Sequence, residues 1–291
     1  MVARRWSPLA LFAAGAVLAS GTLSAATKLA FERLALHQYE DGPLLPSSHD
    51  FLPGETVWFS CRITGFESEP AGDNRDNRNV KLSWRIGLLD PAKIPVEPAK
   101  TGRLEESLRL QDKDWVPKFV VSFLLPSFIP GGSYHIPVSV KDELAGSEIS
   151  GDLEIHVRAE SIEPSASFVI RNFRFLRNED DTAALRSPIT YKQGSTLWAR
   201  FEMAGYRFEA NNKFSVEYGL AILGADGKEL FAQPVAAAES KESFYPQLRV
   251  PGALSLHLDA NVPLASYTLV VTVRDKIGGD AVELRETFSV E

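Results

Sequence analysis

The chain contains related stretches of sequence twice, and this internal repeat limits what it can fold into. Phe51–Phe66 aligns without a gap on Tyr191–Tyr206, and Ser133–Asp142 aligns in the same way on Ser266–Asp275. Blocks that recur in the same order, separated by the length of a domain, are far too widely spaced for a solenoid, whose repeats are about 20–50 residues long. We therefore expect the 291 residues to contain two copies of one domain.

Apolar residues occupy every second position within the repeated blocks. Val57–Ile63 has this pattern in the first copy, and Leu197–Met203 has it in the second. Period-two alternation is typical of a β-strand with one buried face. Turn residues such as Gly131–Gly132 and Gly278–Gly279 separate the runs. The sequence thus predicts an all-β fold of two tandem antiparallel β-sandwich domains, each with about seven short strands.

Both copies resemble immunoglobulin-like domains. Trp84 and Tyr218 lie where that fold often keeps an inward aromatic residue, and Pro130–Tyr134 and Pro263–Tyr267 resemble its tyrosine corner. The openings of the first pair of aligned blocks are also similar to strand openings in bacterial macroglobulin-type domains. The resemblance covers nearly all of the chain after the N-terminal segment, and it implies a fold only, because this fold hosts many unrelated functions.

Residues 1–26 are typical of a signal peptide. Arg4–Arg5 precede the apolar run Leu9–Leu18, and the small residues Ser24–Ala26 follow it. The alternative is an N-terminal membrane anchor, but the run is shorter than the ~20 apolar residues that a membrane span needs. We expect an exported protein of the periplasm, the cell surface or the extracellular space, with no membrane span once the signal peptide is removed.

The repeat sets the expected domain limits: residues 27–158 and 166–291 form the two domains, and residues 159–165 form a linker. Cys61 is the single cysteine, so no internal disulfide can form and each domain depends on its apolar core. Cys61 aligns with Phe201 on a buried face, which indicates a core residue rather than a nucleophile.

Charge and motifs exclude several classes of function. A net charge of −7 and a pI near 5.4 argue against a nucleic-acid partner. The sequence has no Gly-x-Ser-x-Gly, no His-Glu-x-x-His and no glycine-rich phosphate loop. The polar run Asp73–Asn79 has the composition of a solvated loop, in which arginines would oppose a calcium ion. We expect neither an enzyme nor a cofactor.

Trp58 and Trp198 are the candidate binding surface. They occupy the same position in the two copies, and alternation places both on the face opposite the core. Exposed tryptophan is favoured in contacts with partners. The alternative is that residues 39–50 and 178–190 fold over the two rings.

A weaker candidate is a metal site formed by His135, His156 and Glu154. A hairpin turning near Ala145 would place the two histidines roughly opposite each other on the outward face. The alternative is two solvated surface histidines.

The leading hypothesis is an exported, non-catalytic binding or scaffolding protein whose partner is another envelope or extracellular protein, or a glycan. A carbohydrate-binding accessory protein is the first alternative. A metal-dependent enzyme with an unrecognised site is the second.

Overall fold

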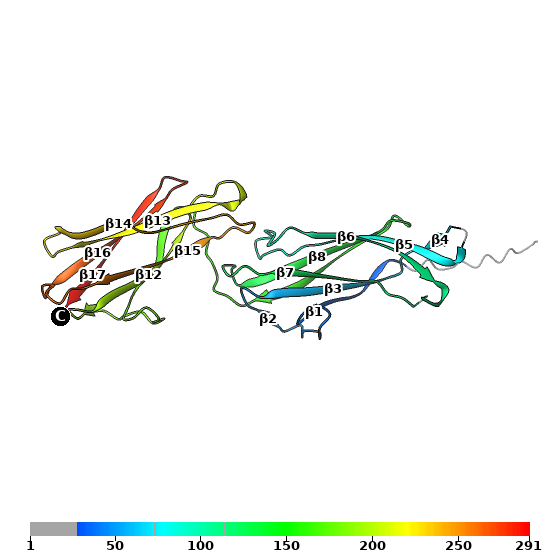
Figure 1. Ribbon diagram of the computed structural model, residues 1–291, viewed down its shortest axis with the longest axis horizontal. Helices are drawn as coiled ribbons and strands as arrows, with labels where there is room; N and C mark the ends of the chain where they lie inside the picture. The colour runs from blue at the N-terminus through cyan, green and yellow to red at the C-terminus, as the bar shows by residue number, and fades with distance from the viewer. Residues whose placement is uncertain (1–27, 73, 113) are drawn as a thin grey trace, which may run out of the picture.

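Figure 1 shows the computed structural model, which describes residues 28–72, 74–112 and 114–291. The regular secondary structure of the described chain is almost entirely β-strand, arranged as two sandwiches that lie end to end. No helix among these residues has the length and apolar character that crossing a membrane requires. The predicted signal peptide, residues 1–26, lies outside the described residues.

The first sandwich packs a three-stranded sheet, in the order β1-β3-β7, against a larger sheet in the order β2-β9-β8-β5-β4, with β6 paired to β5. Its apolar core lies between the two sheets. The strands are β1 (Ala30–His37), β2 (Asp50–Phe51), β3 (Thr56–Thr64), β4 (Glu69–Ala71), β5 (Asn74–Ile86), β6 (Lys100–Arg109), β7 (Lys118–Leu124), β8 (Gly132–Asp142) and β9 (Glu148–Val157).

The second sandwich repeats this arrangement. A sheet in the order β10-β12-β15 packs against one in the order β11-β17-β16-β13-β14 around a second apolar core. All named strand pairs are antiparallel except the two short pairs β2/β9 and β11/β17. The strands are β10 (Val169–Leu176), β11 (Thr190–Tyr191), β12 (Thr196–Ala204), β13 (Phe214–Leu223), β14 (Glu229–Lys241), β15 (Arg249–His257), β16 (Ser266–Asp275) and β17 (Ala281–Val290).

The prediction of an all-β fold of two antiparallel sandwiches is therefore confirmed. One local expectation was wrong: most of the polar run at 73–79 is not a loop, because Asn74–Asn79 begins β5. Within this stretch β5 pairs with β4 on one side and with β6 on the other. Backbone pairing on both edges satisfies the hydrogen-bonding groups of a strand whatever its side chains are.

The tyrosine corners that the sequence suggested are present in both sandwiches. The hydroxyl of Tyr134 donates to the carbonyl of Pro130, and that of Tyr267 donates to the carbonyl of Pro263, both at 2.7 Å. Each bond ties the start of a core strand to the loop before it, since donor and acceptor are four residues apart.

The two inward aromatic positions are filled differently. Trp84 is only partly buried and packs on Phe119, with ring centroids 5.6 Å apart. Tyr218 is buried against Phe201 at 5.2 Å, and its hydroxyl donates to the carbonyl of Ala253. A phenol at this position keeps its polar end satisfied inside the sandwich.

The two sandwiches also contact each other directly. The loop between β14 and β15 lies at the end of the second sandwich that faces the first (Figure 1). It inserts Tyr245 into the first core, where the residue is 2% exposed. The Tyr245 ring stacks on Phe128 at 6.3 Å, and the Nζ of Lys241 lies 4.6 Å from the centre of the Phe128 ring. This contact, which the sequence did not suggest, joins the two sandwiches through a buried side chain.

Candidate functional site

Trp58 and Trp198 lie on the outer faces of β3 and β12, as alternation predicted. Both are intermediate in exposure. The segments that follow β1 and β10 do fold back along these sheets: the amide of Leu45 donates to the carbonyl of Leu36 at 2.9 Å, and the amide of Leu185 donates to that of Phe175 at 2.8 Å. The rings are thus neither fully open nor fully covered, and their role in binding stays a prediction.

The two histidines are offset by two residues and do not lie directly opposite each other. His135 lies opposite Glu154 in the β8/β9 hairpin, and His156 lies opposite Ser133. The turn spans Asp142–Ser147, so its centre lies one residue earlier than two directly opposed histidines would need. In an antiparallel pair, moving the centre of the turn by one residue moves the partner of every residue by two.

Each histidine has a carboxylate of its own instead. The Nδ1 of His135 lies 2.6 Å from Asp152 Oδ2, and the Nδ1 of His156 lies 3.1 Å from Asp50 Oδ1. Within the described part of the chain, no three His, Cys, Asp or Glu side chains come together as a metal site. The geometry therefore gives no support to the metal candidate that included Glu154.

Cys61 is fully buried in the first core. Burial raises the pKa of its thiol to about 12. A thiol with such a pKa is protonated at neutral pH, and the thiolate is the reactive form. Cys61 is therefore a core residue, as its alignment with Phe201 indicated.

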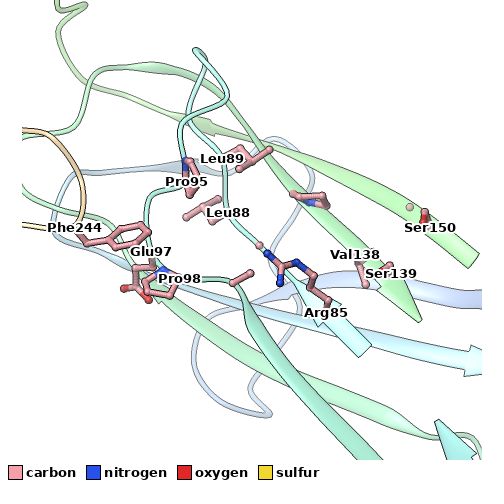
Figure 2. Close-up of a pocket in the computed structure, with 14 residues that line it drawn as sticks. Arg85, Leu88, Leu89, Pro95, Glu97, Pro98, Val138, Ser139, Ser150 and Phe244 are labelled. Atoms are coloured by element: carbon pink, nitrogen blue, oxygen red, sulfur yellow. The ribbon is translucent and has the colours of Figure 1, made fainter. Parts of the chain in front are cut away.

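A pocket of about 560 Å³ lies where the first sandwich meets the second, and we call it the interdomain pocket. Its walls come from the end of β5 and the loop after it, from β8 and β9, and from a single residue of the second sandwich, Phe244. Figure 2 shows Phe244 beside Glu97 and Pro98, with Arg85, Val138 and Ser139 farther along the pocket. The volume lies within the ~300–1,000 Å³ typical of ligand pockets, which occur preferentially at domain interfaces.

The lining is mostly apolar, with two charged side chains. The apolar part consists of Leu88, Leu89, Pro95, Pro98, Ala99, Pro137, Val138 and Phe244. Glu97 is held by the protein itself, because its carboxylate accepts from the amide of Leu124 at 2.9 Å and from Lys100 Nζ at 2.8 Å. Arg85 has no hydrogen bond or ion pair with any described residue. The pocket thus offers an apolar cavity with one uncommitted positive charge.

Phe244 and Tyr245 are consecutive residues with different environments. Tyr245 is buried in the first core, whereas Phe244 is 52% exposed and lines the interdomain pocket. Sequence reasoning missed both residues, since neither lies in an alternating block or in a motif. The sequence did contain one signal of a contact at this place: two consecutive aromatic residues, Phe244 and Tyr245, in the loop between β14 and β15.

No family model and no curated protein matches the chain. Similar solved structures include the C-terminal domain of the AgI/II polypeptide BspA of Streptococcus agalactiae, 11% identical with a TM-score of 0.29 over 89% of this chain and 99% of that one. The C-terminal domain of the antigen I/II-family protein AspA of Streptococcus pyogenes is 9% identical with a TM-score of 0.30, over 91% and 99%. Red sea bream transglutaminase is 9% identical with a TM-score of 0.25, over 89% of this chain and 31% of that one. At TM-scores this low, these likenesses carry no argument about function.

Proposed function

We propose that this protein is an exported, non-catalytic binding protein that holds a segment of a partner protein in its interdomain pocket. The observation that carries the proposal is the pair Phe244–Tyr245. Tyr245 is anchored in the core of the first sandwich, and this anchor holds Phe244 against the pocket. A cavity whose walls come from two firmly joined domains is preorganised, which lowers the entropic cost of binding.

The pocket lining specifies the chemistry of the partner segment. The apolar walls suit one apolar side chain, whose burial contributes about 1.5–3 kcal/mol. Arg85 suits a carboxylate next to that side chain, because a guanidinium pairs with a carboxylate through two parallel hydrogen bonds. The expected occupant is an extended peptide that carries an apolar residue beside an acidic one.

A peptide library displayed on phage tests this proposal. We expect selection on the purified protein to enrich peptides with an apolar residue next to Asp or Glu. Phe244→Ala and Arg85→Ala should each weaken their binding at least fivefold. Phe231→Ala is the matched control, because Phe231 is 43% exposed on β14 and does not line the pocket. The proposal would be overturned if the selected peptides bound the wild type and all three variants equally, or if selection on a folded sample enriched no peptide.

A further inference from the structure

A second hollow surface lies on the outer face of the sheet β10-β12-β15, beside the segment that joins the two sandwiches. It consists of two adjoining hollows of about 880 and 340 Å³, which share Asn172, Arg174 and Glu202. Four arginines line it: Arg171, Arg174, Arg200 and Arg249. We call it the arginine cleft. Four arginines on one face are notable in a chain whose net charge is −7.

A β-bulge in β10 places two of these arginines on the same face. Arg171 lies opposite Glu202 of β12, and Arg174 lies opposite Arg200, so three steps along β10 match two along β12. Residues three apart on a regular strand point to opposite faces. The extra residue of the bulge brings Arg171 and Arg174 onto the same face. Asn172, inside the bulge, has a φ of 53°, and its side-chain amide donates to Glu202 Oε2 at 2.9 Å.

The arginines differ in how far their charge is already paired. Arg249 is neutralised, because its Nη1 lies 2.8 Å from Glu160 Oε2 and 3.2 Å from Glu202 Oε1. Arg171 donates to the backbone carbonyl of Glu163, and Arg200 donates to that of Glu179. A carbonyl accepts a hydrogen bond but carries no net charge, so these two guanidinium groups keep their charge available.

Arg174 is the least satisfied of the four. Among the described residues, its Nε is the buried side-chain polar atom that has no hydrogen-bond partner. Leaving a buried polar group unpaired is costly, and more so when the group is charged. Because Arg174 lines both hollows, a ligand anion in the cleft would reach the guanidinium that lacks a partner.

The remaining lining narrows the class of ligand. Glu160, Glu163 and Glu202 lie in the same hollow, so a polyanion would be repelled, whereas a ligand with one negative charge would not. The carboxylates and the amide of Asn172 suit hydroxyl groups, which both donate and accept. Trp198 precedes Arg200 by two residues on the same face of β12, so an amphipathic aromatic ring lies next along the strand from a cleft residue.

We propose that the arginine cleft binds a sugar residue that carries one carboxylate, with Arg174 as the main partner of that carboxylate. The inference does not depend on the interdomain pocket, since the two sites share no residue.

Calorimetric titration of the whole protein tests the inference, with a trisaccharide that contains one galacturonate and two galactose residues and so carries a single carboxylate. We expect saturable binding, at least tenfold weaker binding of the neutral galactose trisaccharide, and no saturable binding of inorganic phosphate or of an acidic Glu-rich peptide. Arg174→Gln should weaken binding at least tenfold while the protein remains folded, and Arg174→Lys should restore part of it. The matched control is Arg285→Gln, because Arg285 is 62% exposed on β17 and lies outside the cleft.

Three outcomes would overturn the inference: no binding of the acidic trisaccharide to the folded protein, equal binding by Arg174→Gln, or preferential binding of phosphate or peptide. Phe244→Ala must keep the sugar affinity of the wild type. This variant separates a failure of the cleft from a failure of the interdomain pocket.

Discussion

The hydroxyl of Tyr245, in the second sandwich, donates a 2.7 Å hydrogen bond to Asp90 Oδ2 in the first. Both residues are 2% exposed, and the other carboxylate oxygen of Asp90 accepts from the amide of Ile94 at 2.7 Å. The junction of the sandwiches therefore has the character of a protein core. Domains that share such a contact are expected to move together rather than independently.

Removing the Tyr245 hydroxyl should weaken the junction. Tyr245→Phe keeps the ring but leaves a buried carboxylate oxygen of Asp90 without its donor. We expect the free energy of unfolding to fall by about 1–3 kcal/mol. Urea denaturation measures this change. Tyr39→Phe is the control, since Tyr39 is 58% exposed and should change the stability little. A Tyr245→Phe protein as stable as the wild type would show that the bond contributes nothing.

Alkaline pH should destabilise the protein through its buried tyrosines. Burial raises the pKa of Tyr191 to about 12, and burial followed by the Asp90 carboxylate raises the pKa of Tyr245. In the unfolded chain tyrosine ionises near pH 10, so the unfolded state binds fewer protons above that pH. The stability from these groups is fully present below about pH 10 and is lost as the pH rises toward the folded values.

Urea denaturation at a series of pH values from 8 to 11.5 checks this. We expect a falling free energy of unfolding above about pH 10, and Tyr245→Phe should reduce the slope. A flat profile over this range would contradict the prediction.

Gly102 should not tolerate a methyl group. A Cβ at Gly102 would lie 2.4 Å from Cζ2 of Trp84, on the neighbouring strand. We expect Gly102→Ala to destabilise the protein by about 1–3 kcal/mol, the usual cost of overpacking. At Gly87 the nearest atom to such a Cβ is 3.5 Å away, so Gly87→Ala is the matched control and should be close to neutral. Equal melting temperatures for the two variants would count against this packing argument.

The two candidate tryptophans should differ in function. Trp198 lies two residues before Arg200, a cleft residue, on the same face of β12, whereas Trp58 has Ser60 and Arg62 as its neighbours on the same face of β3. We therefore expect Trp198→Ala to weaken binding of the trisaccharide with one galacturonate residue severalfold and Trp58→Ala to leave it unchanged. The same calorimetric titration measures both. Equal losses would indicate a general effect on the sandwiches instead of a local contact.

Much of the fold was predictable because its signals are local. Alternation in Val57–Ile63 and the Pro130–Tyr134 motif depend on near neighbours in the chain, and the structure contains the corresponding strand and hydrogen bond. The hairpin of His135 and His156 was also recognised, but its register was not. Register depends on where the turn closes, and Asp142 sets this by accepting from the amides of Leu144 and Ala145.

The candidate sites were less predictable because they depend on contacts between distant residues. Tyr245 meets Asp90 across 155 positions, and nothing in either local sequence announces the pairing. The arginine cleft depends on a β-bulge, which changes the face that Arg171 and Arg174 share. Strict alternation would have placed one of them toward the core.

The pairing of Phe244 with Tyr245 has a thermodynamic consequence. Any opening of the junction that withdraws Tyr245 from the first core also carries Phe244 away from the pocket wall. Closing the junction therefore raises the affinity for a peptide that contacts Phe244. Binding of that peptide stabilises the closed junction by the same free energy, since coupling between two equilibria is reciprocal. A peptide in the pocket would therefore narrow the range of angles between the two sandwiches, and this range can be measured without observing the pocket itself.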